Sequence, residues 1–287
     1  MSRTLFGIIL SLASAASFAA NSTLASIAYS HGATPLSVAT FRTVLAVVIL
    51  FGILRIWRVP TRLPSRLRWQ AFGLGILLAI YSFALLAAVS RIPVALAVLT
   101  FYLYPLFTAI GAWVTGQERM TLSLGAALVA AFVGLALALN IGGGELDSFG
   151  VGLAVTAAVF NTVLILLNRH LVGDTDSRPI SLHMLFSGTI GFLVVNAVVG
   201  SFPMPDTTAG IAAFIGVGLF YSFSIIAFFS AISMIGPVRT GILMNFEPVT
   251  SVFLGVVVLS QVLMPLQFLG AAIVVGAIVF AALNKAR

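Results

Sequence analysis

The segment from Tyr81 to Ile92, YSFALLAAVSRI, returns in altered form from Tyr221 to Ile232 as YSFSIIAFFSAI. Tyr-Ser-Phe opens both segments, and alanine, serine and isoleucine recur at matching places further along. The same offset of 140 residues brings Asn21 onto Asn161. Because several matches share one offset, they indicate an internal repeat in which the second half of the chain copies the first.

The composition predicts that this repeat lies in a membrane. Apolar residues make up 61% of the chain and charged residues only 7%, so most of the surface must face lipid. A hydrocarbon layer about 30 Å thick needs roughly 20 apolar residues per helical crossing, which leaves room for about ten crossings. The predicted spans lie near residues 5–27, 35–57, 69–89, 93–115, 121–139, 149–169, 180–200, 208–233, 237–260 and 264–283.

The first twenty residues resemble a cleaved signal peptide, but the repeat predicts that they are kept as the first span. Each half then holds five spans, and an odd number makes the second half enter the membrane from the opposite side. We therefore predict an all-α membrane protein of ten transmembrane helices, arranged as two inverted five-helix repeats around a central cavity. The predicted boundaries are 1–140 for the first repeat, 141–148 for a connecting loop and 149–287 for the second repeat.

Charge predicts the orientation. Five arginines crowd one connection between two spans, at positions 55, 58, 62, 66 and 68, as in a cytoplasmic loop. With ten crossings the termini share that side, so we expect both termini in the cytoplasm and the chain in a bacterial inner membrane. The net charge of +7 is explained by these loops and does not indicate nucleic-acid binding. The chain has no cysteine, which excludes disulfides and thiolate ligands.

Several polar side chains are predicted at the bilayer centre. Glu247 lies ten residues beyond Pro237, which places it about 15 Å deep. An ionisable group at that depth should face the bundle interior or a wet cavity. Glu247 is then a proton carrier, a counter-ion for a cationic substrate group, or a structural hydrogen-bonding group. Arg42, about 10 Å deep, either pairs with a carboxylate such as Glu247 or reaches outward.

Aromatic, amide and hydroxyl groups share this level and suit a small amphipathic solute. The alternative is that they hold neighbouring helices together as structural hydrogen bonds. The predicted substrate-binding residues are Tyr81, Phe101, Tyr104, Asn161, Tyr221, Asn245 and Glu247.

Two prolines in matching spans are predicted hinges. Pro105 falls opposite Pro248 after a small insertion in the second half. Neither has the N–H that bonds the carbonyl four residues earlier, so the carbonyls of Phe101 and Met244 are freed. We interpret the two prolines as paired flexure points, with static kinks as the alternative.

Short motifs at these positions resemble the drug/metabolite transporter superfamily, EamA type, and within it the YddG exporters of amino acids. They are Phe41-Arg42, Tyr104-Pro105, Gly116-Gln117-Glu118-Arg119 and Glu247-Pro248. The second half departs from the pattern with Ser260-Gln261, where the resemblance implies Gly/Ser-x-Glu. The resemblance implies an exporter with a ten-helix fold.

We therefore expect a transporter that exports small metabolites, chiefly amino acids including aromatic ones, by alternating access. A multidrug or cationic-compound exporter is the alternative, and a channel or an intramembrane enzyme would be a different class. An enzyme is not expected, because the chain has no His-Glu-x-x-His and no serine with a nearby histidine base. We expect no cofactor and no metal. The expected partners are a small-molecule substrate and the lipid bilayer, with a monomer as the working form and no nucleic acid.

Overall fold

The chain folds into helices that are long enough to cross a membrane. The structure, a computed structural model, describes residues 2–89, 91–92, 94–118, 121–138, 147–173, 176–259 and 264–283. Eight helical stretches in these ranges are long and apolar enough to span a bilayer, and two shorter apolar helices complete the ten predicted crossings. The predicted all-helical membrane fold is confirmed.

Two of the crossings are interrupted, so the described chain forms twelve helices. The first repeat contains α1 (Arg3–Ser30), α2 (Pro35–Ile56), α3 (Ser65–Val89), α4 (Val94–Phe101), α5 (Tyr104–Val114) and α6 (Leu122–Ala138). The second contains α7 (Ser148–Val172), α8 (Ser177–Val199), α9 (Thr208–Ile235), α10 (Pro237–Met244), α11 (Phe246–Leu259) and α12 (Pro265–Leu283). The predicted spans agree with these bounds to within about four residues.

Prolines start several helices because a backbone N–H in the first turn has no partner within the helix, so its absence in proline costs nothing there. Pro35 opens α2, and Thr34 and Ser37 cap that helix reciprocally, each side chain accepting from the other's backbone N–H. Pro237 opens α10 after Gly236, whose φ of +82° favours glycine. The predicted helix start at Pro93 lies outside the described residues.

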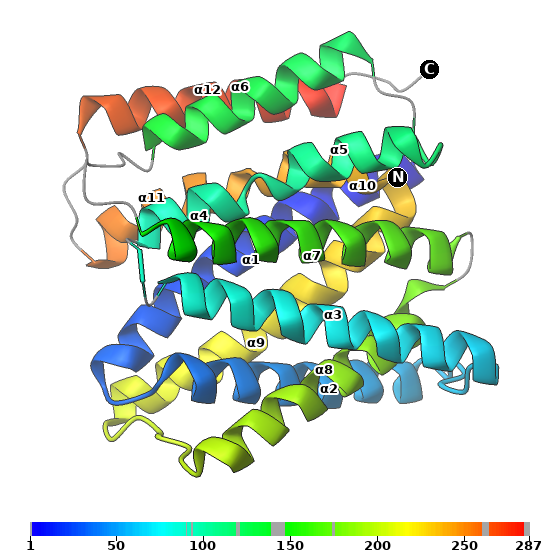
Figure 1. The fold of residues 1–287 in the computed structure, drawn as a ribbon, viewed down its shortest axis with the longest axis vertical. Coiled ribbons are helices and arrows are strands. Elements are labelled where there is room, and N and C mark those ends of the chain that lie inside the picture. Colours follow the sequence, from blue (N-terminus) through cyan, green and yellow to red (C-terminus); the bar gives the residue numbers. More distant parts are fainter. Residues whose placement is uncertain are drawn as a thin grey trace.

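The two repeats interleave (Figure 1). α1 packs along α9, and its repeat mate α7 packs along α3, the mate of α9. In the same way α2 contacts α9 while α8 contacts α3, and α6 lies beside its own mate α12. Every one of these pairs joins one repeat to the other. Exchanging mates converts each of the first four pairs into another observed pair and leaves the α6–α12 pair unchanged. This is the inverted two-fold relation that the repeat predicts.

The loops between helices show which segments lie at the same end of the bundle. α1 begins and α12 ends on the right of Figure 1, at the end where α2 is connected to α3. At the opposite end Arg91 pairs with Asp147 at 3.4 Å. Most of the predicted connecting loop, residues 141–146, lies outside the described residues, as do Arg119 and Ser260-Gln261, so the repeat boundaries stay a prediction.

Candidate functional site

The fourth crossing of the first repeat is broken beside Pro105. α4 ends at Phe101 and α5 begins at Tyr104, and we call Tyr102 and Leu103, which form a turn between them, the first break. Pro105 has no N–H to donate to the carbonyl of Phe101. The missing bond explains why α4 ends at that residue.

The matching crossing of the second repeat is broken at Asn245, which we call the second break. α10 ends at Met244, and α11 begins with Phe246. Pro248 is unable to donate to the Met244 carbonyl, so this helix also ends at the residue whose carbonyl the proline frees. The Asn245 side-chain amide donates to the Gly241 carbonyl at 3.1 Å, which satisfies a backbone group that the break exposes.

The two interrupted crossings lie against each other. α10 contacts α5, and both are visible side by side in Figure 1. A Cβ added to Gly241 would lie 3.3 Å from the Cβ of Pro105, so the absence of a side chain at Gly241 permits this approach. The two interrupted crossings are therefore in direct contact within the bundle.

Four aromatic rings gather around the first break, and we call them the ring cluster. Tyr81 of α3 stacks on Phe101 with centroids 5.9 Å apart and planes 17° apart. Tyr104 lies 5.3 Å from Phe101 and 5.8 Å from Tyr102. These distances are typical of attractive aromatic pairs. Tyr81 and Phe101 are only half-buried, so part of the cluster keeps accessible surface.

An acidic group just beyond the second break, in the first turn of α11, faces these phenols. The Glu247 carboxylate lies within reach of the Tyr102 hydroxyl and close enough to Tyr81 and Tyr104 for electrostatic interaction. Glu247 itself is half-buried. A carboxylate deep in the bundle is thus combined with polar ring edges and some accessible surface.

Arg42 supplies the opposite charge. Its guanidinium carbon lies 4.5 Å from the centre of the Tyr221 ring, a cation–π distance, and Phe18 meets that ring edge-on at 6.0 Å. Among the described residues Arg42 forms no ion pair within 4.0 Å, and its buried Nε has no hydrogen-bond partner. Arg42 and Glu247 therefore interact through space without the direct pairing that the sequence left open.

The two predicted asparagines lie beside this site. Asn161 is buried on α7, which packs on α4 and α5, and its neighbour Thr162 donates its hydroxyl to the Tyr104 carbonyl at 3.2 Å. Asn245 is buried and bonded within its own break. The structure brings together Tyr81, Phe101, Tyr104 and Glu247. Tyr221 is linked to them because Arg42, which lies over its ring, also interacts electrostatically with Glu247. The substrate roles of all seven predicted residues stay predictions.

Two further residues belong to this neighbourhood but were not in the predicted set. Tyr102 occupies the first break, and its place beside Tyr104 was the signal that could have identified it. Phe18 packs on Tyr221 from α1. No sequence pattern marks Phe18, because it stands in the apolar run that resembles a signal peptide.

A second polar contact joins the repeats outside the membrane spans, where α5 ends. The Gln117 side chain donates to the carbonyl of Leu166 in α7 at 3.4 Å. The Glu118 carboxylate lies against Gly236, the residue that caps α10, so closely that an added Cβ there would collide with Oε1. A carboxylate at a helix N-terminus is favoured by the helix dipole.

Burial gives Glu118 an unusual titration. Desolvation raises the pKa of its carboxyl to about 7, although the Val238 N–H, Arg169 and Arg239 act in the opposite direction. Arg239, in the first turn of α10, is thus one of two arginines whose charge acts on this carboxylate. The charge state of the contact between α5 and α10 therefore changes near neutral pH.

Within the described ranges, no three histidine, cysteine, aspartate or glutamate side chains gather closely enough to hold a metal ion. The polar groups around the ring cluster are instead phenols, the Glu247 carboxylate and the Arg42 guanidinium, which suit the recognition of charged and aromatic groups.

Comparisons with known proteins give the chain a family and a fold. The model of the EamA-like transporter family matches residues 5–140 and again residues 148–283. A solved crystal structure resembles this one with a TM-score of 0.80 over 99% of both chains, at 19% sequence identity. That likeness concerns the fold alone. No curated protein matches the chain.

Proposed function

Because the chain belongs to the EamA-like transporter family, we propose that it exports small metabolites, chiefly amino acids including aromatic ones, by alternating access. It is a multi-pass membrane transporter and not an enzyme. The chemistry around the two breaks supports the proposed substrate class.

The observation that carries the proposal is the unpaired arrangement of Arg42 and Glu247. The two side chains interact through space, yet no direct ion pair joins them among the described residues. Charges inside a membrane protein need a partner or water. A zwitterion supplies both partners at once, since its carboxylate bonds the guanidinium and its ammonium bonds the carboxylate.

The ring cluster supports an aromatic or apolar side chain on that zwitterion. Tyr81 and Phe101 stack nearly in parallel, and both keep accessible surface. A substrate ring adds to such a stack at low conformational cost, and the pairing is worth about 0.5–1.5 kcal/mol beyond burial. Aromatic amino acids are therefore the favoured substrates within the class.

Pro105 and Pro248 are the proposed hinges. Each stands two or three residues beyond a helix break, and the two interrupted crossings touch at Gly241. A break at which a proline leaves one backbone carbonyl unbonded lets one helical piece tilt while the other stays packed. Alternating access then arises when the pieces on one side of the breaks separate as those on the other side close.

A cationic-compound exporter is the second candidate, and Glu247 among the phenols favours it. Organic cations bind such carboxylate and aromatic groups. The positive charge of Arg42 would repel such cations and weaken their binding. Replacing Arg42 by glutamine should therefore strengthen transport of a cation but weaken transport of an amino acid.

We also propose that both termini lie in the cytoplasm of a bacterial inner membrane. The arginine-rich connection between α2 and α3 supports this orientation. In this cysteine-free chain, a cysteine replacing the exposed Ser65 should label from the cytoplasmic side, and one replacing the exposed Ser148 from outside. The reverse labelling pattern contradicts the orientation.

The proposed function is tested by uptake into liposomes that contain the purified protein. A labelled panel of aromatic, aliphatic and cationic solutes should show saturable transport with aromatic amino acids preferred. Runs with and without a pH gradient separate proton-coupled from facilitated transport. Transport of organic cations alone, with no amino acid competing, contradicts amino-acid export.

A further inference from the structure

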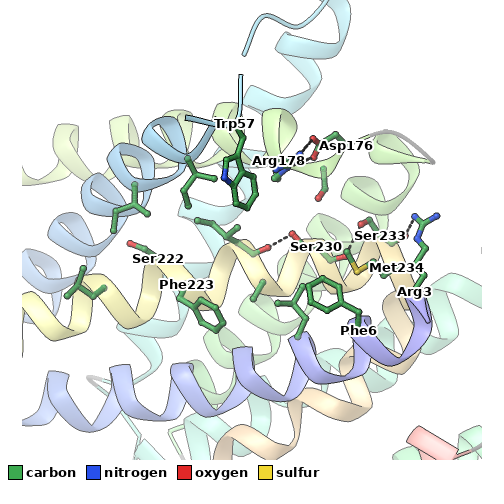
Figure 2. Close-up of a pocket in the computed structure, with 17 residues that line it drawn as sticks. Arg3, Phe6, Trp57, Asp176, Arg178, Ser222, Phe223, Ser230, Ser233 and Met234 are labelled. Atoms are coloured by element: carbon green, nitrogen blue, oxygen red, sulfur yellow. Dashed lines mark hydrogen bonds and ion pairs between the residues drawn. The ribbon is translucent and has the colours of Figure 1, made fainter. Parts of the chain in front are cut away.

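A groove lies away from the ring cluster, between α1 and α2, with further lining from α9 and from the start of α8. Its volume is about 570 Å³. Figure 2 shows α9 running between α1 and α2, with labelled side chains from α1 and α9 and with Trp57, which follows α2, around the groove. None of the residues of the ring cluster lines it, nor does Glu247 or Arg42. The groove is thus separate from the proposed substrate site.

The length of the groove matches one leaflet of a bilayer. Its lining follows α9 from Leu219 to Met234, which is about 22 Å of helix, and half of a bilayer with its headgroup region is about 20–22 Å. Leu219 and Phe223 present apolar surface, each about half exposed.

The serines of the lining do not oppose an apolar occupant. The Ser222 hydroxyl donates to the Gly218 carbonyl at 2.6 Å, and the Ser230 hydroxyl donates to the Ile226 carbonyl at 2.7 Å. Their donors are satisfied within α9, so no free hydroxyl proton has to be desolvated when a hydrocarbon chain lies against them. The middle of the groove behaves as an apolar surface.

One end of the groove carries charge. Arg178 is paired with Asp176 and stacks over Trp57 at 5.1 Å. On the facing wall Arg3 donates to the Ser233 carbonyl at 3.3 Å and is exposed. Figure 2 shows these groups at the same end of the groove. Since Asp176 compensates Arg178, Arg3 leaves this end with a net positive charge, beside a tryptophan of the kind that marks membrane interfaces.

We propose that this groove binds an anionic phospholipid, with one acyl chain along α9 and the phosphate at Arg3. An apolar groove one leaflet long, open at a positively charged end, is complementary to a molecule with a hydrocarbon tail and an anionic head. The bilayer itself supplies that molecule. Phe223 in the groove lies two residues after Tyr221 of the proposed substrate site, so the lipid would lie against the helix that holds Arg42's aromatic partner.

The experiment uses full-length protein reconstituted with photoreactive lipids whose acyl chain carries a diazirine. One lipid has a phosphatidylglycerol head and the other a phosphatidylcholine head, and adducts are located by peptide mass spectrometry. We expect adducts on peptides carrying Phe6, Leu219 and Phe223, enriched about fivefold for phosphatidylglycerol, the gain typical of one basic residue near the surface. The readout is independent of transport, so a failure of the proposed function leaves it intact.

Two variants with matched controls complete the test. Ile53→Trp fills the groove and should remove the adducts, while Val48→Trp, exposed on the same helix but outside the groove, should not. Arg3→Gln should abolish the headgroup preference, while Arg62→Gln in the exposed loop should keep it. If Ile53→Trp does not purify as a monodisperse protein, Ile53→Phe replaces it. Adducts spread equally over exposed faces such as Phe268, or equal labelling by both lipids, would overturn the proposal.

Discussion

The first and second breaks share one architecture but differ in chemistry. Each interrupts the fourth crossing of its repeat, and each helix ends at the residue whose carbonyl a proline leaves unbonded. The first break is surrounded by tyrosine and phenylalanine rings, whereas the second carries an amide and a carboxylate. In the proposed mechanism, the repeat would thus supply equivalent places for movement, and the divergence between the copies would supply two unlike walls for one substrate.

The largest expected effect comes from removing the charge of Glu247, just beyond the second break. Glu247→Gln keeps the shape but loses the charge-assisted bond to a substrate ammonium, which should weaken amino-acid affinity about 10–100-fold. Tyr102→Phe, the matched change at the first break, should have a clearly smaller effect. Affinities from competition in proteoliposomes check both. Unchanged rate, affinity and pH profile for Glu247→Gln would show that Glu247 is structural.

Changing a ring of the first break should alter specificity more than overall binding. Phe101→Leu keeps the volume roughly but removes one stacking face, which should lower affinity for aromatic amino acids about three- to tenfold and leave aliphatic ones nearly unchanged. Phe107→Leu, further along α5 and outside the ring cluster, serves as control. An equal loss for aromatic and aliphatic substrates would contradict a stacking role.

The prolines test what the breaks have in common. Pro105→Ala and Pro248→Ala each restore a backbone donor, so the helix can close across the break and movement should slow. We expect turnover to fall by about three- to tenfold with affinity retained, since conformational steps limit many such cycles. Pro35→Ala, at a helix start, should be neutral. Normal turnover in both hinge variants would show that the breaks are static kinks and do not move during transport.

The smallest effect concerns the α5–α10 contact at Glu118. An unfolded carboxyl titrates near 4.5, whereas burial raises the pKa of Glu118 to about 7. Between these values the folded protein binds more protons than the unfolded chain, so the free energy of unfolding falls as pH rises through this window. Thermal unfolding should show an apparent Tm about 2–4 °C lower at pH 7.5 than at pH 5.

Two variants isolate the carboxyl responsible for that slope. Glu118→Gln should flatten the dependence of Tm on pH, while Asp206→Asn, at an exposed acidic position, should preserve it. If the slope is the same in wild type and Glu118→Gln, the titrating group lies elsewhere.

The sequence predicted the crossings and the positions of the two interior prolines' effect on the backbone because both depend on local rules. Apolar runs set the span lengths, and a proline inside a helix removes a defined bond, so the carbonyls of Phe101 and Met244 could be identified as unbonded. The spans themselves were predicted as continuous, and the structure shows that the helices end at these residues. Depth along a helix also placed Glu247 and Tyr104 at one level. These inferences require only residue spacing.

Lateral neighbours could not be predicted in the same way. Phe18 meets Tyr221, and Glu118 meets Gly236, across more than one hundred residues of chain. Such contacts depend on how the repeats interleave, and periodicity in one segment carries no information about its partner. The relation between Arg42 and Glu247 stayed open for this reason, since depth alone does not give the distance between side chains on different helices.

The most direct test of the account asks whether Arg42 and Glu247 divide the two charges of one substrate. Wild type, Arg42→Gln and Glu247→Gln are compared for phenylalanine, for its amine analogue lacking the carboxylate, and for its acid analogue lacking the ammonium. The account predicts that wild type prefers the zwitterion, that Arg42→Gln shifts preference to the amine, and that Glu247→Gln shifts preference to the acid. If transport of all three compounds falls equally in both variants, or if both variants keep the wild-type preference, then these residues do not recognise the substrate's charges.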